Sequence, residues 1–78
     1  MAKDYRVVNS IDSPDKTRCV DIIELDQSGF RFQEWRREPE DLSGWILMGD
    51  SRPIVYESAQ QALAAAREAV VWLCDVIR

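Results

Sequence analysis

The sequence contains no histidine, only three glycines and three prolines, and only two cysteines. Without histidine, a Ser/His/Asp triad, the activation of a cysteine by histidine and metal sites built on imidazole are all excluded. Cys19 and Cys74 lie far apart in the sequence, and no other thiol completes the four ligands of a structural zinc site. We therefore expect no metal or other cofactor and interpret both cysteines as reduced thiols.

Long apolar segments are also missing. The most apolar stretch, residues 62–77, is interrupted by charged residues such as Arg67 and Asp75, so it does not predict a membrane span. Residues 1–9 lack the apolar segment of a secretory signal peptide. Of the 78 residues, 46% are hydrophobic and 31% charged, as in a small folded domain. We expect a single domain over residues 1–78 that is cytoplasmic and not bound to a membrane.

The balance of charge is acidic. Fourteen Asp and Glu side chains outnumber ten Lys and Arg side chains, and the formal net charge is −4. Such a balance opposes nonspecific binding to nucleic acid or to an anionic membrane. The acidic residues Glu38, Glu40 and Asp41 fall in an expected loop, where water solvates them, and nothing pairs them with an activated nucleophile. A chain of this size also has little volume for a substrate pocket, so we do not expect an enzyme.

Four segments have the composition of strands, either rich in β-branched residues or alternating between apolar and polar residues, with turn residues between them. They are residues 18–26, 30–37, 45–49 and 54–57. Residues 1–17 are polar and are expected to form an arm with at most a short strand at residues 5–8.

The segment Ser58-Ala59-Gln60-Gln61 has the pattern of a capping box and predicts the start of a helix. No Gly or Pro follows up to Ile77, and the first half is rich in alanine, the best helix former. The apolar residues cover about 200° of the helical wheel, more than one sheet can bury. We predict the α+β class: a three- to four-stranded antiparallel meander followed by one long C-terminal helix packed on one face.

The faces of the predicted sheet depend on strand register. With a two-residue turn between the first two long strands, Leu25 pairs with Phe32 and Ile23 with Glu34. In this register Phe30, Phe32, Leu25, Ile23, Ile46 and Met48 face the helix, and a bulge is needed to turn Glu34 out of that row. The outer face carries a set of apolar and basic side chains, namely Ile22, Trp35, Trp45, Leu47, Arg31, Gln33 and Arg37. In an alternative arrangement, a slip of one residue or a bulge turns Trp35 or Trp45 to the inside.

Two apolar surfaces are candidate partner-binding sites. One is the outer sheet face with Ile22, Trp35 and Trp45, and the other is the helix edge with Trp72 and Val76. Exposed patches of this size mark interaction surfaces, and a two-fold dimer is the commonest closed assembly. We expect a small non-enzymatic interaction module with a regulatory or accessory role. Its partner is a second copy or another protein, and the helix edge is preferred because it does not depend on register.

A second hypothesis is binding of single-stranded nucleic acid. Arg31, Trp35, Arg37 and Trp45 combine aromatic platforms with guanidinium groups, as single-strand-binding surfaces do. The order of four strands and a helix resembles that of the Whirly and related single-strand-binding coactivator folds, although no sequence motif is shared. The net negative charge ranks this hypothesis second, because neutralisation of phosphates supplies most of such affinity.

Overall fold

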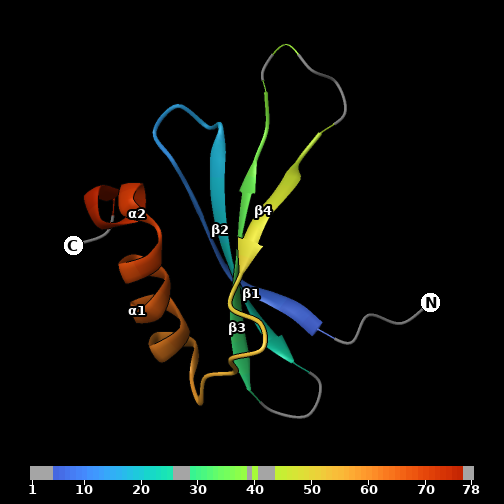
Figure 1. Cartoon of the computed structure of the whole chain (residues 1–78), viewed down its shortest axis with the longest axis vertical. Coiled ribbons are helices and arrows are strands. Elements are labelled where there is room, and N and C mark those ends of the chain that lie inside the picture. The colour runs from blue at the N-terminus through green and yellow to red at the C-terminus, as the bar shows by residue number, and fades with distance from the viewer. Residues whose placement is uncertain (1–4, 26–28, 39, 41–43, 77–78) are drawn as a thin grey trace.

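The computed structural model describes residues 5–25, 29–38, 40 and 44–76. Over these residues an antiparallel sheet of four strands, paired in chain order, is followed by two helices (Figure 1). The elements are β1 (Tyr5–Asp12), β2 (Arg18–Leu25), β3 (Phe30–Arg36), β4 (Ile46–Asp50), α1 (Ala59–Ala69) and α2 (Val71–Val76). The predicted α+β class and the meander are confirmed.

The strands of the sheet are not all the expected ones. The arm predicted at the N-terminus contains β1, which pairs with β2 along its length around a bulge between Val7 and Asn9. The strand expected at residues 54–57 is absent, and Tyr56 forms a single bridge with Phe30 through backbone bonds of 2.7 and 2.8 Å. A polar segment becomes a strand here because β2 supplies the hydrogen-bond partners for its backbone.

Side chains close the turn between β1 and β2. The Asp15 carboxylate accepts hydrogen bonds from Ser13 Oγ at 2.7 Å and from Thr17 N and Oγ1 at 3.1 and 2.8 Å. These bonds, that of Ser13 foremost, lower the pKa of Asp15 from 3.8 to about 2. Lys16 has a left-handed backbone with φ 64°. This turn sets the register in which Asp12 lies opposite Cys19.

The register between β2 and β3 differs by three residues from the predicted one, because Ile22 and not Leu25 lies opposite Phe32. The last pair before the turn is Glu24 with Phe30, so the connection is longer than two residues. An odd shift turns every β2 side chain to the other face relative to β3. Ile22 therefore lies on the helix side, fully buried, and its predicted place on the outer face was wrong.

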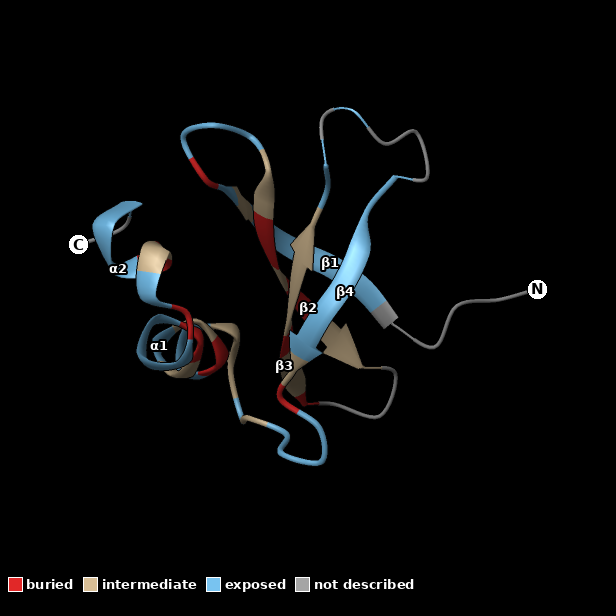
Figure 2. Ribbon diagram, turned by 45° about the horizontal axis from the view of Figure 1, so that its top comes forward, coloured by how far each residue is buried: buried red, intermediate tan, exposed pale blue. Residues whose placement is uncertain are grey.

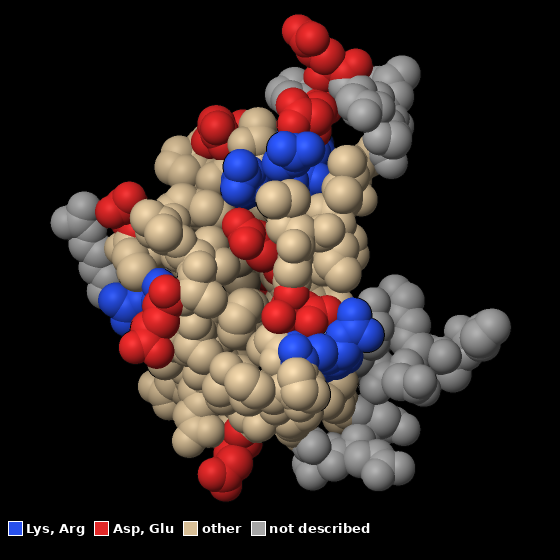
Figure 3. All heavy atoms as spheres, in the orientation of Figure 1, with Lys and Arg blue, Asp and Glu red and all other residues tan. Residues whose placement is uncertain are grey.

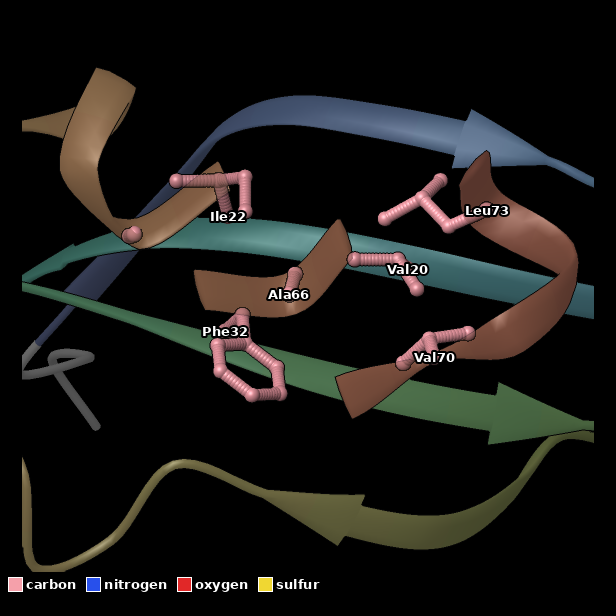
Figure 4. Close-up of a cluster of buried hydrophobic side chains, with 7 residues drawn as sticks. Val20, Ile22, Phe32, Ala66, Val70 and Leu73 are labelled. Atoms are coloured by element: carbon pink, nitrogen blue, oxygen red, sulfur yellow. The ribbon is translucent and has the colours of Figure 1, made fainter. Parts of the chain in front are cut away.

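The core lies between the helices and the two central strands. Side chains of β2 and β3 meet those of the helices in one cluster (Figure 4). It comprises Val20, Ile22, Phe32, Ala62, Ala66, Val70 and Leu73. The alanines of α1 have no bulky side chain, so the helix lies close to the sheet. This burial supplies the main stabilising free energy of the domain.

The C-terminal helical region is broken at Val70, so the prediction of one long helix was wrong. Val70 has extended backbone angles, φ −112° and ψ 105°, although its N–H still donates to the Ala66 carbonyl at 2.8 Å. The break changes the direction of the chain, and both Val70 and Leu73 reach the core. Burial of these two side chains outweighs the loss of helical hydrogen bonds, and β-branched valine favours a helix only weakly.

The predicted start of the helix is confirmed. Ser58 is the N-cap, and its Oγ accepts a hydrogen bond from Gln61 N at 3.0 Å. The Gln61 side chain returns to the backbone N–H of Glu57 at 3.1 Å, one residue before the expected one. The first bond satisfies a donor that has no partner within the first turn of the helix, and the second ties the residue before the cap to that turn.

The helix α1 packs against β2 and β3, the two central strands. Strand β4, at one edge of the sheet, is exposed along nearly its whole length (Figure 2). Neither of the two helices in the described ranges is long and apolar enough to cross a membrane.

Candidate partner-binding surface

Apolar side chains gather at one edge of the sheet. Trp45 and the first three residues of β4, Ile46, Leu47 and Met48, each expose 39–48% of their surface. We call these four residues the β4 edge. No charged residue interrupts them, and within the described residues β4 pairs with a neighbour only on its β3 side. Charges commonly protect an exposed edge strand from pairing with another chain, so their lack here leaves a surface suited to association.

The outer sheet face carries the tryptophans that the sequence placed there. Trp35 lies opposite Cys19 on β2 and opposite Leu47 on β4, on the face away from the helices. The bulge that the alternative arrangement required does occur, next to Trp35, but it does not turn Trp35 inside. The Arg37 guanidinium lies 5.0 Å from the ring centre of Trp45, a cation–π distance. All but one of the predicted outer-face residues thus lie on this face: Trp35, Trp45, Leu47, Arg31, Gln33 and Arg37. Ile22 lies on the opposite face, in the core.

A pocket of about 400 Å³ opens on this outer face. Its lining comes from all four strands or the residues beside them: Ser10, Asp12, Cys19, Asp21, Trp35 and Trp45. Ser10 Oγ donates to Asp21 Oδ1 at 2.8 Å, and Cys19 Sγ lies 3.3 Å from the same oxygen. The sequence did not point to Ser10, Asp12 or Asp21 as site residues, because only the pairing of β1 with β2 brings them beside the tryptophans.

The two thiols differ strongly in environment. Cys19 is buried and Cys74 is exposed. Burial, reinforced by the neighbouring Asp21 carboxylate, raises the pKa of Cys19 to about 12. At mildly alkaline pH the Cys19 thiol is therefore almost fully protonated, and the thiolate is the reactive form.

We expect one fast-reacting thiol per folded chain when Ellman's reagent is added at mildly alkaline pH. The Cys74→Ser variant should lose the fast phase, and the Cys19→Ser variant should keep it. After unfolding in urea, both thiols of the unmodified protein should react. A fast phase that persists in Cys74→Ser would contradict the burial of Cys19.

The helix edge offers less apolar surface than the sequence indicated. Trp72 is half-buried against the core, and its Nε1 donates to Glu34 Oε2 at 3.2 Å. Arg18 Nη1 lies 3.6 Å from the same carboxylate oxygen. Only Val76 of the two predicted residues of this edge is exposed. Since Trp72 is already packed and hydrogen-bonded, the preference for the helix edge over the sheet was not supported by the geometry.

Basic side chains do not form a continuous track on the face seen in Figure 3. They occur in small groups, each beside acidic side chains. Several form ion pairs: Arg52 with Asp50 at 2.8 Å, Arg6 with Glu24 at 2.7 Å and Arg36 with Glu38 at 3.4 Å. Within the described part of the chain, no group of three or more His, Cys, Asp or Glu residues is placed to hold a metal ion.

No protein-family model, curated protein or solved structure matches the chain. Its class therefore follows from its own geometry. It is a small α+β protein with an open four-stranded antiparallel sheet, helices over the two central strands, and an uncovered apolar edge strand.

Proposed function

We propose that the protein is a small non-enzymatic interaction module, with a regulatory or accessory role in the cytoplasm, that associates with a second copy of itself. The observation that carries this proposal is the β4 edge. Four consecutive apolar side chains are exposed there, three of them on β4, and among the described residues β4 pairs only with β3. Monomeric proteins usually avoid this combination because it invites strand pairing.

A second copy fits this edge. Residues 44–49 carry no charge, so two β4 strands can lie side by side without bringing like charges together. Antiparallel pairing about a two-fold axis places the Asp50 end of each strand beside the Trp45 end of the other. Pairing would also satisfy the backbone groups of β4 and cover side chains that α1 does not cover.

The test is the solution mass across a dilution series, measured by light scattering. We expect about 18 kDa for the unmodified protein, twice the 9.0 kDa of one chain. The Leu47→Lys variant should fall to the mass of one chain, because a charge then lies in the interface. Val71→Lys is the matched control, since Val71 is 83% exposed on α2, away from the β4 edge, and should stay dimeric.

The outcomes separate the possibilities. An unmodified protein that stays at 9.0 kDa at micromolar concentrations would refute self-association. If Leu47→Lys stays dimeric and Val76→Lys dissociates, the interface is the helix edge.

One observation favours single-strand nucleic-acid binding as a second candidate, the stacking of Arg37 on Trp45 beside Trp35. Two carboxylates of the same face, Asp12 and Asp21, oppose it because they repel phosphates. We therefore expect no quenching of tryptophan fluorescence by single-stranded DNA at physiological salt. A salt-sensitive response that Trp35→Ala abolishes would instead support the second candidate.

A further inference from the structure

The outer-face pocket combines two kinds of groups that both attract cations. Asp12 of β1 and Asp21 of β2 supply carboxylates, and Trp35 and Trp45 supply indole rings. Carboxylates bind ammonium and guanidinium groups by charge-assisted hydrogen bonds, and indole rings attract the same groups through their electron-rich faces. Among the described residues that line the pocket, none is basic.

Both carboxylates have capacity left for a ligand. The side chain of Asp12 is 44% exposed, and its ion-pair partner Lys16, whose Nζ lies 3.7 Å from the Asp12 carboxylate, is 65% exposed. Asp21 accepts a hydrogen bond from Ser10 and lies beside the Cys19 thiol, whereas a carboxylate has about four lone-pair sites. A ligand can therefore bond to both without displacing the contacts within the sheet.

The pocket also shows the electrostatic character that a cation needs. Arg37, which does not line the pocket, already lies over the Trp45 ring at 5.0 Å, so a guanidinium group is accommodated next to this indole. The raised pKa of Cys19 has burial as its main cause and the negative charge of Asp21 as a further one. An anion would meet two carboxylates in the same space.

We infer that the pocket binds a basic side chain, the guanidinium group of an arginine or the ammonium group of a lysine, presented by an extended segment of a partner protein. This goes beyond self-association, because the pocket opens on the face of the sheet and the β4 edge lies along its side. Trp45 belongs to both the β4 edge and the pocket lining, so the two interactions are neighbours on the sheet.

The probe is the peptide acetyl-Gly-Arg-Gly-amide, titrated into ¹⁵N-labelled protein at low salt. The matched control peptide carries citrulline, a neutral residue of nearly the same shape as arginine. The chain has three tryptophans, and their indole N–H signals report on the binding position. Trp35 and Trp45 line the pocket, whereas Trp72 is bonded to Glu34 on the helix side and serves as an internal reference.

We expect saturable, millimolar binding of the arginine peptide that shifts the Trp35 and Trp45 signals and not that of Trp72. The citrulline peptide should bind at least tenfold more weakly. The double variant Asp12→Asn/Asp21→Asn should lose tenfold or more in affinity, and Asp12→Asn alone, which leaves the bond between Ser10 and Asp21 intact, should lose part of it. Asp75→Asn, at an exposed carboxylate of α2, should bind as the unmodified protein does.

Equal binding of the two peptides, equal shifts of all three indole signals, or full affinity in the double variant would overturn the inference. The same titration on an Ile46→Lys variant keeps this result separate from self-association, because Ile46 lies on the β4 edge but pairs with Arg36 on the opposite face of the sheet from Trp35. If that variant is monomeric and still binds the arginine peptide, both proposals stand. If that variant is monomeric and does not bind the peptide, only the pocket is refuted.

Discussion

Replacing Ile22 by alanine is expected to leave the chain largely unfolded at room temperature. Ile22 is fully buried between β2, β3 and the helices, so the shorter side chain leaves a cavity in the centre of the core. Such a truncation typically destabilises a protein by about 2–5 kcal/mol. A domain of this size rarely has a free energy of unfolding above about 3–5 kcal/mol. The loss is therefore comparable to the whole stability.

The measurement is urea unfolding followed by circular dichroism, at one protein concentration for all variants. Ile54→Ala is the matched control, because the same residue type is 55% exposed there. We expect its free energy of unfolding to change by no more than about 0.5 kcal/mol. If Ile22→Ala unfolds at the same urea concentration as Ile54→Ala, Ile22 lies on the outer face and the register found here is wrong.

Gly29 is the second position at which a small change should have a large effect. Its backbone has φ +128°, a conformation that residues with a side chain rarely adopt. A Cβ atom added at Gly29 would also collide with Cγ1 of Val55, in the segment between β4 and α1. Next to it, Phe30 and Tyr56 are joined by two backbone hydrogen bonds, so the backbone at Val55 has little freedom to move. For Gly29→Ala we expect backbone strain of about 1–3 kcal/mol and a packing penalty of similar size.

Gly44→Ala separates these two contributions. Gly44 also has a positive φ of +90°, but no atom of the described residues lies within 4 Å of a Cβ added there. We expect only the backbone term, about 1–3 kcal/mol, in the same urea experiment. Equal destabilisation by the two substitutions would contradict the close packing of Gly29 against Val55.

Several features followed from local sequence because their causes are local. The hydroxyl of Ser58 caps α1 through a residue three positions later, and the alanine-rich segment after it forms a helix by its own propensity. Alternation along residues 30–36 correctly separated Phe32, which faces the core, from Trp35, which faces outward. The predicted cluster of Trp35, Trp45 and Arg37 depended on this alternation and on a shared outer face.

The tertiary structure decided what depends on contacts between distant segments. The connection between β2 and β3 is longer than predicted, so their register differs from the predicted one by an odd number of residues. Ile22 therefore lies in the core and not on the predicted outer surface. Pairing with β2 turned a polar arm into β1 and brought Asp12 and Asp21 beside the tryptophans. Intrinsic helix and strand propensities depend only on neighbouring residues, so they predict neither strand register nor the pairing of distant segments.

The helices show the same division between local and tertiary causes. Sequence predicted that the residues after Ser58 are helical and that their apolar arc is too wide for one sheet. The break at Val70 arises because Val70 and Leu73 gain more by reaching the core than the chain loses in helical hydrogen bonds. Composition and periodicity by themselves thus determined the class of fold and its helical segment. Packing decided the register, the break and which apolar side chains remain exposed, because burial depends on how all the elements fit together.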